Sequence, residues 1–99
     1  MDFDFAVEQI KLVGLEQGYE VGEGERTFEL FIDNHHAVAY KIVANNSSGY
    51  IQVHQWECGE DGSGGKYGRG VYSLRSYSDV AHFCQILVAS AFIRARRRD

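Results

Sequence analysis

The chain has 99 residues, of which 44% are hydrophobic and 24% charged, and its formal net charge at pH 7 is −4. This length is enough for one hydrophobic core and too little for two, so we expect a single domain over residues 1–99. The apolar content excludes disorder as the default state, and no stretch approaches the roughly 20 uncharged apolar residues that a membrane helix needs.

The first part of the sequence predicts a helix over residues 4–17. Apolar and small residues recur at helical spacing, at Phe3, Val7, Ile10 and Gly14. Asp2 and Asp4 suit the positive N-terminal end of the helix dipole. Gly18 is placed to end the helix, because glycine adopts the left-handed C-terminal conformation without steric penalty. Gly14 either weakens the last turn or allows close approach by another element.

From Tyr19 the hydrophobic period changes to two, which indicates strands. A weak opening strand with several Glu and Gly residues is expected at a sheet edge. Alternating runs at residues 27–33, 37–44 and 50–58 follow, separated by turn-forming residues. Residues 59–70 hold six of the eleven glycines and are predicted to be a flexible connection, after which residues 71–74 form a short strand.

The register of the first hairpin follows from side-chain alternation, since residues facing each other across an antiparallel pair point to the same side. We predict that Leu30 faces Tyr40 and that residues 34–36 form the loop. The same register sets Glu29 opposite Lys41, an opposite-charge pair that supports it. The remaining core-side pairs in this register are Phe28 with Ile42 and Ile32 with Val38.

A long C-terminal helix is predicted from about residue 79 to residue 97, capped by Ser76 or Ser78. Phe83 and Leu87 lie on its most apolar side and are expected in the core. Because residues 80–93 are apolar almost all round, this helix should be covered on more than one side, by the first helix or by another subunit. The predicted fold class is α+β: a helix, an antiparallel three- to four-stranded sheet and a long C-terminal helix.

None of the chemical motifs in the sequence meets the requirements of an active site. The Gly65-Lys66 pair lacks the earlier glycine and the following Ser or Thr of a phosphate-binding loop. His54 and Cys58 share one side of a strand, but their spacing matches no zinc motif. Cys84 stands in the most apolar helix, where thiols are usually inert. We therefore expect no enzyme activity, no catalytic residue, no metal and no cofactor.

Compartment and redox state follow from the N-terminus and the cysteines. The start Met1-Asp2-Phe3-Asp4 is acidic, whereas a secretory signal begins with basic residues, so a cytoplasmic protein with no membrane partner is predicted. Cys58 and Cys84 stand far apart and outside any CxxC pair. Two reduced thiols are therefore expected.

Two surfaces are candidates for partner binding. The first is the sheet face opposite the predicted core, whose aromatic area is large for a wet face. A helix could cover it, a bulge could turn Trp56 inward, or the face could serve as a partner or dimer interface. Its candidate residues are Phe31, Tyr50, His54 and Trp56. The second is the arginine end of the last helix, which suits the helix dipole and could also hold phosphates or an acidic protein patch. Its residues are Arg94, Arg96, Arg97 and Arg98.

Charge and element order suggest the function. Residues 1–33 contain nine acids against two basic residues, and residues 71–99 contain five arginines against two acids. In size and charge polarity the chain is similar to phage-encoded inhibitors such as anti-CRISPR proteins. The leading hypothesis is a small non-enzymatic protein that binds a larger protein or complex, as an inhibitor or adaptor, with a homodimer through the C-terminal helix or outer sheet face as a further option.

The alternative is a nucleic-acid-binding module that uses the arginine end and exposed aromatic residues. The double-stranded-RNA-binding domain has a similar element order, with a helix, three strands and a helix. That family begins its second helix with a basic, alanine-rich segment, where this chain has Ser78-Asp79-Val80-Ala81-His82.

Overall fold

A computed structural model describes residues 1–24, 27–32, 35–45, 49–58 and 65–98, with side chains for all of these except residues 32, 35–38, 45, 58 and 93–98. Two helices flank five strands in the sequence. Their order is α1 (Phe3–Glu16), β1 (Glu20–Glu23), β2 (Thr27–Ile32), β3 (His35–Asn45), β4 (Tyr50–Cys58), β5 (Gly65–Leu74) and α2 (Tyr77–Arg98). Neither helix is long and apolar enough, over the described residues, to cross a membrane.

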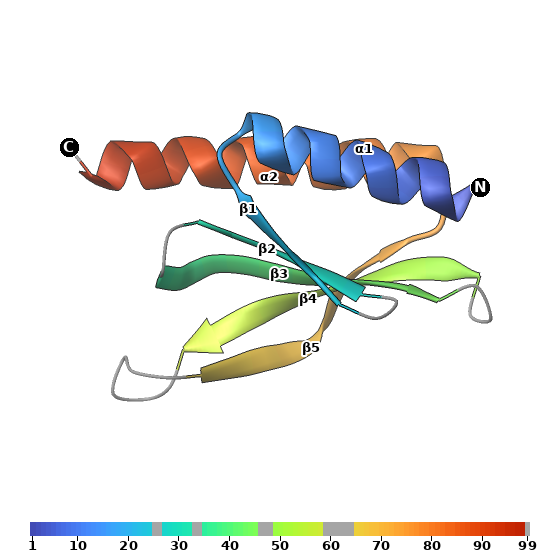
Figure 1. The fold of residues 1–99 in the computed structure, drawn as a ribbon, viewed down its shortest axis with the longest axis horizontal. Coiled ribbons are helices and arrows are strands. Elements are labelled where there is room, and N and C mark those ends of the chain that lie inside the picture. Colours follow the sequence, from blue (N-terminus) through green and yellow to red (C-terminus); the bar gives the residue numbers. More distant parts are fainter. Residues whose placement is uncertain (25–26, 33–34, 46–48, 59–64, 99) are drawn as a thin grey trace.

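The strands form one antiparallel sheet in the order β1-β2-β3-β4-β5, so every strand lies beside its neighbours in the sequence. Both helices lie on the same face of this twisted sheet (Figure 1). The α+β class and the antiparallel sheet are confirmed. The predicted count of three to four strands is wrong, because the opening strand pairs fully with β2 and the sheet has five. As predicted, β1 is an edge strand.

Helix α1 has well-defined ends. The Asp2 carboxylate caps its start by accepting a hydrogen bond from the Phe5 amide at 3.2 Å. At the other end, Gly18 has a φ of +93°. The Gly18 amide donates to the Leu15 carbonyl at 3.1 Å and the Tyr19 amide to the Gly14 carbonyl at 2.9 Å. These two bonds form a Schellman motif, which confirms Gly18 as the stop.

Helix α2 begins two residues before the predicted start, and Ser76 rather than Ser78 caps it. The Asp79 amide donates to Ser76 Oγ at 3.3 Å, and the Asp79 carboxylate accepts from the Arg75 amide at 2.9 Å. This reciprocal arrangement satisfies two amides at the helix start and resembles a capping box. The helical backbone continues to Arg98, and its described side chains run from Tyr77 to Phe92.

The predicted hairpin register holds for most of the β2–β3 pair. Leu30 faces Tyr40 and Glu29 faces Lys41, as expected. The register shifts after Phe31, so that Ile32 pairs with His35 instead of Val38. The prediction of a loop is therefore wrong for residues 35 and 36, which belong to β3, whereas residue 34 lies outside the described residues. The pairing of β2 with β3 is irregular after Phe31.

The prediction that residues 59–70 form a connection is wrong for its second half. Residues 65–70 belong to β5, which extends to Leu74 and pairs with β4. The first half, residues 59–64, lies outside the described residues. Glycines are accommodated in this strand because large side chains of β4 occupy the space beside them.

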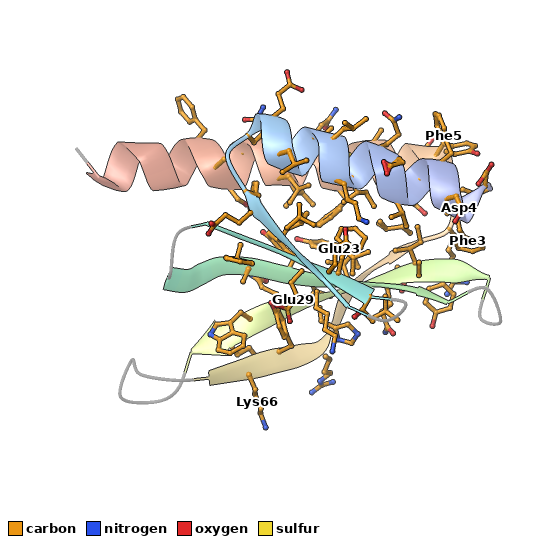
Figure 2. The ribbon with its side chains drawn as sticks, viewed as in Figure 1. Phe3, Asp4, Phe5, Glu23, Glu29 and Lys66 are labelled. Carbon is orange, nitrogen blue, oxygen red and sulfur yellow. The ribbon has the colours of Figure 1, made fainter. Side chains whose placement is uncertain are left out.

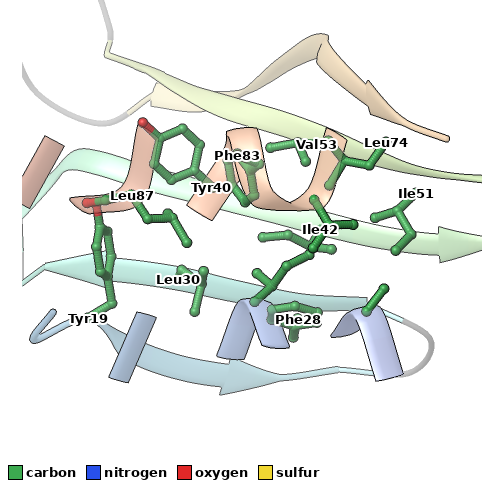
Figure 3. Packing of buried hydrophobic residues seen from close by; sticks show 13 residues of the cluster. Tyr19, Phe28, Leu30, Tyr40, Ile42, Ile51, Val53, Leu74, Phe83 and Leu87 are labelled. Carbon is green, nitrogen blue, oxygen red and sulfur yellow. The ribbon is translucent and has the colours of Figure 1, made fainter. Parts of the chain in front are cut away.

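The core lies between the helices and the sheet (Figure 3). The alternation of β2, β3 and β4 supplies its floor, and Phe83 and Leu87, each 0% exposed, supply its roof, as predicted. Gly14 allows the close approach expected of it, because a Cβ at that position would lie 3.1 Å from Leu30 Cδ2. The strand residues of the core are Phe28, Leu30, Tyr40, Ile42, Ile51, Val53 and Leu74.

Two buried tyrosines attach the sheet side of the core to α2. The Tyr19 hydroxyl donates to the Leu87 carbonyl at 2.9 Å, and the Tyr40 hydroxyl lies 3.1 Å from Ser90 Oγ. Burial raises the pKa of both phenols, and for Tyr19 the proximity of Tyr40 adds to the effect.

The stability of the protein should therefore fall in alkaline solution. In the unfolded chain the phenols ionise near pH 10, whereas the folded state keeps them neutral to higher pH. The unfolded state consequently releases protons first, and the free energy of unfolding should fall above pH 10 by up to about 1.4 kcal/mol per pH unit for each such tyrosine. Urea unfolding at several alkaline pH values measures this slope. Tyr19→Phe should reduce it, and an unchanged slope in that variant would contradict the assignment.

Candidate interaction surfaces

The outer face of the sheet carries no helix, since α1 and α2 both lie on the other face (Figure 1). Trp56 on β4 and Tyr67 on β5 are register partners and point to this outer side. Their rings meet edge to face, with centroids 5.0 Å apart and planes at 86°. Both side chains are half-buried, so the pair forms a preassembled aromatic surface that keeps an accessible edge.

The glycines of β5 make room for large outer-face side chains of β4. A Cβ at Gly65 would lie 2.8 Å from Trp56 Nε1, and one at Gly70 would lie 2.8 Å from Gln52 Cγ. The ring nitrogen Nδ1 of His54 lies 2.9 Å from the Gly68 carbonyl oxygen. The glycine-rich segment is therefore a strand whose missing side chains let Gln52, His54 and Trp56 lie across it.

Tyr67 also reaches toward the centre of the outer face. Its hydroxyl is buried and has no hydrogen-bond partner among the described residues. Burial, followed by the negative charge of Glu29, raises its pKa to about 12. Ala39, which pairs with Phe31 on this same side, is only 1% exposed. Neighbouring side chains therefore cover the centre of the outer face at Ala39.

The predicted outer-face residues do not form one group. His54 and Trp56 lie together near the Gly68 end of β5, where they meet Tyr67 and Gly65. Tyr50 lies at the opposite end of β4 and packs under Arg75, whose guanidinium carbon is 4.5 Å from the ring centroid. Phe31 belongs to the centre of the face through its pairing with Ala39.

Tyr67 was missed by the sequence reasoning because it stands in the presumed connection. The signal that could have found it is an aromatic residue between glycines, opposite a tryptophan on the neighbouring strand. Lys66, its neighbour, projects from β5 away from both helices (Figure 2).

The arginine end of the last helix is placed by the backbone alone. Arg94, Arg96, Arg97 and Arg98 belong to the last turns of α2, and their side chains lie outside the described residues.

The helix layer contains an apolar groove of about 440 Å³ between α1 and α2. The sequence indicated that α2 needs cover on more than one side, but it did not indicate a groove. Val13 and five residues of α2 line it, namely Cys84, Gln85, Val88, Ala89 and Phe92.

A second cavity, of about 280 Å³, lies between α1 and the β1–β2 end of the sheet. Its only described ion pair joins Lys11 Nζ to Glu23 Oε1 at 2.7 Å, with Glu23 between α1 and the sheet (Figure 2). Lys11 Nζ also lies 4.9 Å from the centroid of the Phe28 ring. The lysine is therefore engaged within the chain and serves to attach α1 to β1 and β2.

The candidate metal ligands and the thiol considered from the sequence can be compared with the described residues. No three His, Cys, Asp or Glu side chains among them gather as metal ligands would. Cys84 is a free, half-buried thiol whose pKa is raised by burial, which opposes thiolate formation. Comparisons of the chain with protein-family models, with curated proteins and with solved structures found no match.

Proposed function

We propose that this chain is a small non-enzymatic binding protein whose contact surface is the outer sheet face around Trp56 and Tyr67. The observation that supports this most directly is that both helices lie on one face of the sheet and leave this edge-to-face pair on the other. Trp and Tyr are the residues that most often anchor protein interfaces, because each offers a large rigid area at little entropic cost.

The surroundings of the pair suit a protein partner. Around the half-buried rings stand the polar side chains of Glu29, Lys41 and His54, which lie on the same side of the sheet by register. An apolar centre with a polar rim is the usual anatomy of such interfaces. A module of this kind acts as an inhibitor or adaptor of a larger protein or complex, and the free thiol of Cys84 fits action in the reducing cytoplasm.

The surface should be tested first by capturing partners from the source cell, with and without nuclease and at two salt concentrations. A nuclease-resistant protein partner supports the proposal. Recovery that vanishes with nuclease or salt would instead favour nucleic-acid binding through the arginine end of α2.

With a partner in hand, Trp56→Ala should raise the dissociation rate roughly 30-fold, the effect of losing an anchor worth about 2 kcal/mol. The salt dependence of partner binding should hardly change in this variant, because an aromatic ring acts only on contact. Reversing Arg96 and Arg97 to Glu should slow association and flatten its salt response, since a charge in salt solution acts over about 8 Å at physiological ionic strength. Surface plasmon resonance separates the two rates.

Tyr50→Ala is the matched control, because it removes an aromatic ring from the other end of the same strand. It should leave the dissociation rate close to that of the parent. Equal effects of Trp56→Ala and Tyr50→Ala would move the contact surface away from the Trp56–Tyr67 pair.

A further inference from the structure

The most exposed apolar side chains lie on the helix layer, away from the outer sheet face. Leu12 and Leu15 of α1 are 56% and 57% exposed, and Val88 and Phe92 of α2 are 41% and 63% exposed. Between the two helices runs the apolar groove with Val13 and Cys84 among its lining residues. Proteins rarely leave several large apolar side chains of one layer exposed beside an apolar groove, so this layer has the composition of an interface.

The two helices run in the same direction, which gives the layer two unlike ends. At one end the Asp2 amide donates to the Tyr77 hydroxyl at 3.0 Å, so the starts of α1 and α2 meet there. At the far end, the Tyr19 hydroxyl contacts the Leu87 carbonyl, and α2 continues beyond α1 to Arg98 (Figure 1).

The charge of the helix layer changes along the helices, from acidic where they begin to basic where α2 ends. The starting end carries the acids Asp2, Asp4, Glu8 and Asp79 against Arg75, with Asp4 at the N-terminal end of α1 (Figure 2). At the far end, α1 finishes with Glu16, and the sequence puts four arginines in the part of α2 that extends past it. A partner complementary to this layer must therefore be apolar along its middle, basic at one end and acidic at the other.

A second copy of the chain, turned by a half-rotation, has this complementary pattern. We propose that the helix layer is the interface of a homodimer in which the α1–α2 layers of two copies pack antiparallel. The acidic starting end of each copy then faces the arginine end of the other, so this contact between opposite charges is made at both ends of the dimer. The helix dipoles of the two copies also run antiparallel, which is favourable. This inference goes beyond the proposed function and does not depend on it, because the outer sheet faces stay exposed on both sides of the dimer.

The dimensions agree with a stable interface. Helices α2 and α1 have 22 and 14 residues, lengths of about 33 Å and about 21 Å, and each packed helix is about 10 Å wide. The layer therefore measures about 540 Å², close to the roughly 500 Å² per partner that a specific interface needs as a minimum.

Sedimentation equilibrium of the full chain tests the dimer. The expected mass is twice the 11.2 kDa of one chain. Val88→Asp should lower it to that of one chain, with an unchanged far-ultraviolet circular dichroism spectrum. Val71→Asp is the control, because Val71 is similarly exposed at 48% but lies on β5. A monomeric parent at high micromolar concentration, or a Val88→Asp variant as dimeric as Val71→Asp, would overturn the proposal.

Charge reversal tests the orientation. One variant carries Asp4→Lys with Glu8→Lys, and another carries Arg96→Glu with Arg97→Glu. In the antiparallel dimer each variant alone sets like charges together at both ends, so its dimer dissociation constant should rise at least tenfold at low salt. An equimolar mixture restores opposite charges at both ends and should recover dimerisation as a heterodimer. In a head-to-head arrangement, each variant alone would dimerise as well as the parent, which would overturn the antiparallel geometry.

Discussion

Replacing Leu87 with alanine is expected to lower the free energy of unfolding by about 2–5 kcal/mol. Leu87 is 0% exposed and belongs to the cluster between the helices and the sheet. Its truncation removes apolar contacts and leaves a cavity that the surrounding strands can only partly fill. The hydrogen bond from the Tyr19 hydroxyl goes to the backbone carbonyl of Leu87, so it is kept in the variant. The loss therefore reports packing alone.

Leu15→Ala provides the matched comparison, since it makes the same substitution in a helix at a residue that is 57% exposed. Its effect on unfolding should stay within about 0.5 kcal/mol, provided that both variants are measured in the same oligomeric state. Chemical denaturation followed by circular dichroism gives both values. If the two substitutions had equal effects, Leu87 would not be part of the core.

The inner face of the sheet could be predicted from the sequence because only one of its faces is buried by helices. In such a sheet a one-residue slip would expose every core side chain, so the alternation of β2, β3 and β4 is strict and the register can be read from it. This is why Leu30 opposite Tyr40 and Glu29 opposite Lys41 are found as predicted. The irregular pairing after Phe31 lies at the end of the β2–β3 pair, where no alternation of core side chains marks the register.

The position of the helices was harder to predict, because α2 is apolar almost all round. The structure divides that apolar surface into three parts. Phe83 and Leu87 face the core, Cys84 lies toward α1 in the floor of the groove, and Val88 and Phe92 are exposed. Periodicity alone identified the first part and indicated that further cover was needed, but it could not distinguish cover by α1 from cover by another chain.

The first part of β5, residues 65–70, was missed because glycine is unfavourable in strands when each residue is considered alone. In this sheet the preference is overridden by packing across strands, since the absent side chains of Gly65 and Gly70 accommodate Trp56 and Gln52. The same error hid Tyr67, the second half of the aromatic pair. Trp56 could thus be predicted from the alternation of β4, whereas Tyr67 could be identified only once β5 was known to lie beside β4.

Gly65→Ala is therefore expected to disturb both the stability and the aromatic surface. Gly65 has a φ of +134°, a conformation that residues with a Cβ rarely adopt, and its added Cβ would meet the Glu57 carbonyl and the Trp56 indole. Backbone strain of about 1–3 kcal/mol, together with displacement of these neighbours, should lower the free energy of unfolding by about 2–4 kcal/mol.

Because Trp56 is the only tryptophan, its fluorescence reports the displacement directly. Gly65→Ala should shift the emission maximum of the folded protein to longer wavelength as the indole leaves its place beside Tyr67. Gly49→Ala is the control: Gly49 also has a positive φ, +78°, but an added Cβ there would meet nothing within 4 Å. It should share part of the strain without changing the emission. A spectrum shifted equally in both variants would mean that strain in the sheet, rather than contact with Gly65, determines where Trp56 lies.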